Sequence, residues 1–187
     1  NEPHVPFAAR PLTSEVSTVC GIFGYIGHQQ ALPILVEGLR RLEYRGYDST
    51  GVAVDDGQSI QTHKTVGKVA DLKAILPPSV QGTLGIAHTR WATHGGVTQV
   101  NTHPHASEAG TVHLVHNGII ENYQQLKKGL LKRGIECVSE TDSEVLAHMI
   151  ALEIESGSTP LESVQKTLRR LRGTWGLCIL FKEHDLL

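Results

Sequence analysis

The stretch CGIFGYI, residues 20–26, begins the part of the chain in which the sequence becomes regular. It is a short apolar run bounded by Gly27, a pattern typical of a buried strand. Apolar residues then recur at helical spacing from Leu32 to Leu42, and Pro33 falls in the first turn, where a helix tolerates proline. The sequence therefore predicts a buried strand that leads directly into an amphipathic helix.

Further apolar runs of strand length predict five more strands, at 51–54, 60–66, 83–88, 111–115 and 174–181. Apolar residues at helical spacing predict four more helices, at 69–76, at 123–133, at 142–155 and from Pro160 to the residues before Gly173. The strands come in groups instead of alternating strictly with helices. This order favours a layered α+β or sandwich arrangement over a doubly wound parallel sheet.

Composition and charge exclude several kinds of partner. A net charge of −2 gives no electrostatic basis for binding nucleic acid or a membrane surface. No apolar run approaches the roughly 18 residues that a membrane span needs. Three cysteines without a CxxC pair argue against a disulfide framework and indicate a reducing compartment, so we expect a cytoplasmic protein. The histidines form no HExxH motif, and we expect neither a metal ion nor another cofactor.

Four segments carry residue types that are suited to chemistry: CGIFG at 20–24, LEYRGYDSTG at 42–51, HTRWATHGG at 88–96 and VHNGIIEN at 115–122. Three of them also have a plain structural interpretation, as a small core cysteine, a surface loop and an Asn-Gly hairpin turn. The segment at 88–96 is different. Arginine, tryptophan, threonine and two histidines at the end of a strand line a polar pocket better than they fill a core.

In this order, the four segments resemble the glutaminase domain of the class II glutamine amidotransferases. The stretches RRLEYRGYDSTG, HTRWATHG, HNGIIENY and SETDSE are similar to the glutamine–fructose-6-phosphate aminotransferases (isomerising), also called glucosamine-6-phosphate synthases. The related phosphoribosyl pyrophosphate amidotransferases typically have HRGQDS and RYST where this chain has YRGYDS and RWAT. The resemblance covers residues 20–187.

The resemblance implies a four-layer αββα sandwich of the N-terminal-nucleophile hydrolase class, with L-glutamine as substrate. It implies a glutaminase domain at residues 20–187 that is incomplete at its C-terminus, and residues 1–19 are expected to be an extension or propeptide outside the fold. In the family, sugar-isomerase modules follow this domain, and nothing in this chain corresponds to them. The implied partner is therefore the sugar-isomerase domain of a full-length enzyme, which would form a homodimer.

The resemblance also assigns roles to residues. Cys20 is the implied nucleophile, which attacks the glutamine side-chain amide and forms a γ-glutamyl thioester. The side chain of Asn117 and the backbone N–H of Gly118 would form the oxyanion hole. The implied residues that bind substrate or close over it are Arg90, Trp91, Thr93, His94 and Asp142. An alternative for Asp142 is a purely structural role, because acids in a first helical turn often only complement the helix dipole.

The remaining cysteines, Cys137 and Cys178, are assigned to packing. The other histidines are assigned to structure or surface, with a supporting role left open for His103 and His105.

One departure from the family pattern bears on activity. The family nucleophile is N-terminal and its α-amine, with a pKa of about 7.7–8.0, is suited to take the thiol proton. Here Cys20 is internal, so residues 1–19 are either removed or an artefact of the assigned start, or the protein is catalytically silent. Three functions remain open: a glutaminase that feeds ammonia to glucosamine-6-phosphate synthesis, the glutaminase of another class II amidotransferase, and a silent fragment.

Overall fold

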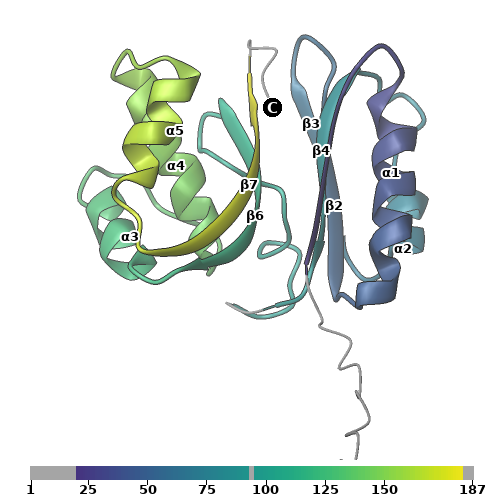
Figure 1. The fold of residues 1–187 in the computed structure, drawn as a ribbon, viewed down its shortest axis with the longest axis horizontal. Helices are drawn as coiled ribbons and strands as arrows, with labels where there is room; N and C mark the ends of the chain where they lie inside the picture. The colour runs from purple at the N-terminus through teal and green to yellow at the C-terminus, as the bar shows by residue number, and fades with distance from the viewer. Residues whose placement is uncertain (1–19, 93–94, 183–187) are drawn as a thin grey trace, which may run out of the picture.

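The computed structural model describes residues 20–92 and 95–182, which form two stacked sheets with helices on both outer sides (Figure 1). The first sheet has the order β1-β4-β2-β3, and its strands are β1 (Gly21–Ile26), β2 (Ser49–Asp55), β3 (Ile60–Val66) and β4 (Leu84–Arg90). The second has the order β5-β6-β7, with β5 (His105–Ala106), β6 (Val112–Ile120) and β7 (Gly173–Phe181). All neighbouring strands are antiparallel. The predicted four-layer αββα sandwich is confirmed.

Two helices cover the outer face of the first sheet, α1 (Ala31–Leu42) and α2 (Val69–Ile75), and a 3-10 turn, η1 (Glu43–Arg45), follows α1. Leu35, Leu39 and Leu72 point into this layer and are fully buried. A Cβ on Gly38 would lie 2.6 Å from the Phe23 ring, so the missing side chain lets α1 approach β1 closely. The amphipathic helix predicted after the first strand therefore packs directly on that strand.

Three helices cover the second sheet: α3 (Tyr123–Leu131), α4 (Asp142–Glu155) and α5 (Pro160–Leu168). The first ten residues of α4 are all buried, because this helix lies against β6 and contacts both α3 and α5. Thr159 caps α5 in a capping box with Glu162, and Pro160 occupies the first turn, as the sequence predicts.

The space between the two sheets is filled by side chains that alternate along the strands. On β2, Val52 and Val54 face the helices and Ala53 faces the other sheet. On β4, Ile86 packs between the sheets together with Val115 of β6. The same alternation places His88 and Arg90, two and four residues after Ile86, on the face of β4 that looks toward the second sheet.

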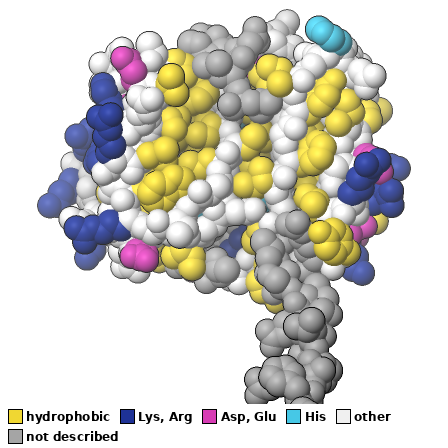
Figure 2. Space-filling model, viewed as in Figure 1, with side chains coloured by type: hydrophobic (Ala, Val, Ile, Leu, Met, Phe, Trp, Pro, Cys, Tyr) yellow, Lys and Arg dark blue, Asp and Glu magenta, His cyan; other side chains and the backbone are white. Residues whose placement is uncertain are grey.

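The outer surfaces of the helices carry different types of side chain from the strand layers. Lys and Arg gather over the outer helices, whereas hydrophobic side chains follow the strand layers on the face seen in Figure 2. On α1, Glu37 pairs with Arg40 at 2.7 Å and with Arg41 at 3.1 Å, both on the exposed side. Among the helices of residues 20–92 and 95–182, none is long and apolar enough to cross a bilayer.

The structure corrects the hairpin interpretation of Asn117-Gly118. β6 continues through both residues to Ile120, and they pair with Gly176 and Trp175 of β7. Gly118 has φ 133°, and a Cβ on it would lie 2.1 Å from the Thr174 carbonyl oxygen. The dipeptide is therefore a strand segment that approaches its neighbour too closely for any side chain, not a turn.

Candidate active site

A cavity of about 290 Å³, lined mainly by polar and charged residues, opens where β1 begins, β4 ends and the N-terminus of α4 meets β6. Six of the eight predicted site residues line it, namely Cys20, Arg90, Trp91, Asn117, Gly118 and Asp142. The other two, Thr93 and His94, lie outside the described residues. Chain segments from both sheets and from one helix therefore meet at one site.

Cys20 stands directly before β1, and its thiol forms part of the cavity wall. The Trp91 backbone N–H donates to its Sγ at 3.0 Å. Burial raises the pKa of the Cys20 thiol above its usual value, against the opposing effects of that hydrogen bond and of the Arg90 charge, while Asp48 adds to the increase. The thiol is therefore protonated near neutral pH and needs a base before it can act as a nucleophile.

Asn117, a residue of β6, lies beside Cys20. Its Nδ2 donates to the Cys20 carbonyl oxygen at 3.0 Å, and its Oδ1 lies 2.8 Å from His88 Nε2. The amide of Asn117 thus connects Cys20 to a buried imidazole on the opposite sheet.

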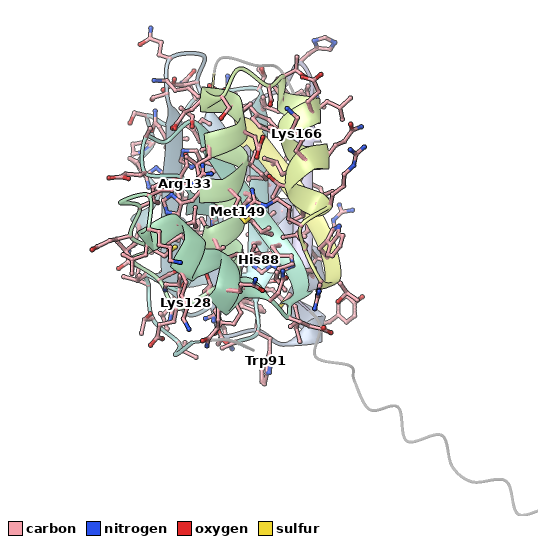
Figure 3. All side chains as sticks on the ribbon, turned by 90° about the vertical axis from the view of Figure 1, so that its left-hand side faces the viewer. His88, Trp91, Lys128, Arg133, Met149 and Lys166 are labelled. Carbon is pink, nitrogen blue, oxygen red and sulfur yellow. The ribbon has the colours of Figure 1, made fainter. Side chains whose placement is uncertain are left out.

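Arg90 and Trp91 occupy the end of β4. Arg90 is 3% exposed, and its Nη1 donates to the Gly96 carbonyl oxygen at 3.3 Å. Trp91 is 44% exposed and projects from the end of the molecule in Figure 3. The Asp48 carboxylate accepts the Ala92 N–H at 2.6 Å, and the Asp48 N–H donates to the Arg90 carbonyl oxygen. Asp48, from the 42–51 segment, thus fixes the backbone at the C-terminal end of β4 through these two hydrogen bonds.

Asp142 is the first residue of α4 and is 5% exposed. The cap of this helix is Thr141, whose side chain accepts the Glu144 N–H. Asp142 instead accepts the Ile120 N–H on Oδ2 at 2.8 Å, and its Oδ1 lies 3.8 Å from His116 Nδ1. Its carboxylate therefore ties α4 to the end of β6 and also lines the cavity.

Three buried histidines line the cavity, His88, His103 and His116, and a fourth, His105, lies behind them with its ring centroid 4.6 Å from that of His103. Ser143 Oγ lies between His103 Nε2 at 2.8 Å and His116 Nδ1 at 2.9 Å. Burial lowers the pKa of His88 to about 4 and that of His105 to about 3, so both imidazoles are neutral near pH 7. The sequence interpretation missed His88 and His116 as lining residues, although the alternation of β4 places His88 on the same face as Arg90.

A second group, Cys137, Glu144 and His148, has ligand-type atoms within 4.8 Å of one another. Both Glu144 carboxylate oxygens already accept backbone N–H groups, from Val138 at 2.8 Å and Ser139 at 2.6 Å. Burial raises the Cys137 pKa to about 11, which leaves the thiol protonated near neutral pH. The carboxylate of Glu144 therefore anchors the segment before α4, a structural use that accounts for its burial.

A cysteine directly before the first strand of two stacked sheets, with its thiol in a cavity lined mainly by polar and charged residues, is the arrangement of the N-terminal-nucleophile class. Solved structures support this class. The glutamine phosphoribosylpyrophosphate amidotransferase of B. subtilis, complexed with ADP and GMP, matches with a TM-score of 0.74 at 31% identity, over 86% of this chain and 35% of that chain. A structure described as the allosteric regulatory enzyme of purine biosynthesis matches with a TM-score of 0.73 at 32% identity, over the same shares.

The family described as the glutamine amidotransferase domain matches residues 88–187, and the chain belongs to this family. Curated relatives are the glutamine–fructose-6-phosphate aminotransferases (isomerizing) of Caldanaerobacter subterraneus and Vibrio vulnificus. The first is 47% identical over 89% of this chain and 27% of the relative. The second is 50% identical over 87% of this chain and 27% of the relative. The predicted family and enzyme class are confirmed, and the chain spans about a quarter of the length of these relatives.

Proposed function

We propose that this domain hydrolyses the side-chain amide of L-glutamine at Cys20 and delivers the ammonia to a sugar-isomerase domain, which makes glucosamine-6-phosphate from fructose-6-phosphate. The observation that carries the proposal is the placement of Cys20, Arg90 and Asp142 around one small cavity. A thiol faces a space bordered by one buried cation and one buried anion. An α-amino acid offers the complementary carboxylate and ammonium groups, and its side chain would extend toward the thiol.

The reaction begins with the α-amine of Cys20, which takes the thiol proton while the sulfur attacks the amide carbon. The oxyanion that forms accepts hydrogen bonds from Asn117 Nδ2 and the Gly118 N–H. It collapses with transfer of the proton to the leaving nitrogen, which departs as ammonia. Water then hydrolyses the thioester to glutamate and regenerates the thiol. Each oxyanion donor in comparable sites is worth a factor of about 10²–10³ in kcat.

This mechanism requires an active form that begins at Cys20. We therefore propose a domain at residues 20–187 that is preceded by a removable extension at residues 1–19. Thr93 and His94 join the substrate-binding set in this proposal, and Trp91, at the rim of the cavity, closes over bound glutamine.

The sequence relationships favour fructose-6-phosphate as the final acceptor. The chain is 47–50% identical to aminotransferases with that name and 31% identical to the phosphoribosylpyrophosphate amidotransferase. A phosphoribosyl acceptor is the second candidate, because the fold also matches that enzyme.

The nucleophile is tested by labelling and substitution. Cys20→Ala should abolish glutamate release with the fold intact, because no other thiol lines the cavity among the described residues. A glutamine analogue with an electrophilic side chain should modify Cys20 alone, as measured by peptide mass spectrometry. Cys178→Ala is the matched control, since Cys178 packs between the sheets, and it should be labelled and active like the parent. Labelling mainly at Cys137 or Cys178 would overturn the assignment.

A further inference from the structure

The Asn117 amide has two ends of similar shape and opposite chemistry. Only the Nδ2 end can stabilise an oxyanion, whereas the Oδ1 end would repel it. The rotation of this amide is therefore as important as its position. The Cys20 carbonyl oxygen, 3.0 Å from Nδ2, can only accept a hydrogen bond, so it selects the orientation with Nδ2 on the Cys20 side.

The opposite end of the amide is held by His88. Asn117 Oδ1 lies 2.8 Å from His88 Nε2, and Oδ1 can only accept. The imidazole must therefore carry its proton on Nε2. Its Nδ1 is buried and has no hydrogen-bond partner among the described residues, so the contact with Asn117 decides the tautomer.

We propose that His88 is a positioning residue for glutamine hydrolysis, whose Nε2–H locks the Asn117 amide with Nδ2 toward the reacting carbonyl. The inference rests on the proposed glutaminase function and deepens it. Asn117 Nδ2 has two hydrogens. One is used on the Cys20 carbonyl oxygen, and the second is left for the oxyanion. His88, on the opposite sheet, holds Oδ1 and so prevents a rotation of the amide that would exchange Nδ2 and Oδ1.

The surroundings keep His88 neutral. It is 1% exposed, and the His103 ring centroid lies 4.3 Å from its own. Burial lowers the pKa of His88 to about 4, against the opposing effect of the hydrogen bond to Asn117, and the charges of the nearby His116 and Arg90 add to the decrease. A neutral imidazole donates one hydrogen bond without bringing a positive charge next to the nucleophile. Because its Nε2 is bonded to Asn117, His88 is also not the base that takes the thiol proton.

Two substitutions at one position separate the hydrogen bond from the bulk of the side chain. His88→Leu removes the donor, and kcat should fall by about 10–10²-fold with KM nearly unchanged, because the lost interaction acts on the transition state. His88→Gln keeps an amide N–H near the position of Nε2 and should recover most of the loss. His113→Leu is the control. His113 lies on the same strand as Asn117 and is 7% exposed, but its Nδ1 lies 3.1 Å from Thr62 Oγ1 and it does not line the cavity, so its loss should leave kcat unchanged.

A double-mutant cycle tests whether His88 acts through Asn117. In an Asn117→Ala background, His88→Leu should lower kcat no further, since there is no amide left to orient. Losses that multiply, or a His88→Gln variant as slow as His88→Leu, would overturn the positioning role. An Asn117→Ala variant with full kcat would instead overturn the oxyanion hole itself, and the role of His88 with it.

A spectroscopic measurement does not depend on activity. The ¹⁵N resonances of the His88 ring should show a protonated Nε2 and an unprotonated Nδ1 in the resting protein. In Asn117→Ala the two tautomers should become mixed, because the acceptor that selects Nε2–H is lost. A resting spectrum with the proton on Nδ1 would contradict the proposal even if every substituted protein failed to fold.

Discussion

Asp142 illustrates how one side chain serves the fold and the site with different atoms. Its Oδ2 accepts the Ile120 N–H and fixes the end of β6 against α4. Its negative charge borders the cavity, where it would meet the α-ammonium group of glutamine. A carboxylate and a carboxamide both offer an oxygen to a backbone N–H, but only the carboxylate offers a charge.

Asp142→Asn should therefore preserve the fold and weaken binding. The amide oxygen can still accept the Ile120 N–H, whereas the ammonium group of glutamine loses its counter-charge. A buried charge left without its partner costs about 2 kcal/mol or more, which is roughly a 30-fold loss of affinity. Titration calorimetry with glutamine, in a Cys20→Ala background that prevents turnover, measures this directly. Unchanged affinity would leave Asp142 only its structural role.

Residue-level chemistry in this chain could be predicted only in part from the sequence. The family resemblance, and not residue type alone, identified Cys20, Arg90 and Asp142 as site residues, and all three line the cavity. Asp48 and His88 were missed because their roles depend on what lies opposite them across a sheet. Sequence spacing shows which face a residue is on, but not which side chain from another strand it meets.

At the scale of elements, the helices and most strands lie where their local signals predict them, and the two exceptions are β6, which runs past the predicted residue 115 to Ile120, and β5. The Thr159 capping box and Pro160 start α5 where the sequence predicts. By contrast, β6 runs through an Asn-Gly pair that favours a turn, because β7 lies alongside and supplies the hydrogen-bond partners. The two-residue strand β5 was not predicted, since pairing with Leu114 and His113 defines it.

Two glycines in different elements should respond to alanine in opposite ways. Gly118→Ala places a methyl group 2.1 Å from the Thr174 carbonyl oxygen at a φ of 133°, and the clash is with backbone. It should destabilise the protein by about 3 kcal/mol or more. Gly129→Ala in α3 meets nothing within 4 Å and should stabilise by about 0.5–1 kcal/mol. Urea unfolding measures both. A tolerated Gly118→Ala would mean that β6 and β7 can separate there.

At the scale of the whole molecule, the two sheets and their covering helices were predicted as layers, but the order of the strands was not. Grouped strands indicate stacked sheets, yet the order β1-β4-β2-β3 depends on long-range pairing that leaves little trace in local sequence. The cavity also depends on contacts between residues that are distant in sequence, since its lining residues extend from Cys20 to Thr174.

The proposed base can be tested on the intact domain. A form that begins at Cys20 should hydrolyse glutamine about 10²–10⁴-fold faster than the full chain, because only the shorter form has a free α-amine beside the thiol. Intact mass must confirm that each protein keeps its intended N-terminus. Glutamate release over time gives the ratio of rates. Equal activity from the two forms would show that another group takes the thiol proton.

The pairing of β6 with β7 also has a consequence for synthesis on the ribosome. β6 carries Asn117 and Gly118, but its partner strand comes after three helices, at residues 173–181. Closing a pair that is distant in sequence is slow, since the loop entropy is lost before the contacts form. The emerging chain can complete the first sheet and its helices early, whereas the cavity wall that contains Asn117 and Gly118 cannot form until β7 has been synthesised. Until then, the edge of β6 that pairs with β7 has no partner strand. We expect a chaperone that holds unfolded chains to bind the nascent protein at this exposed edge.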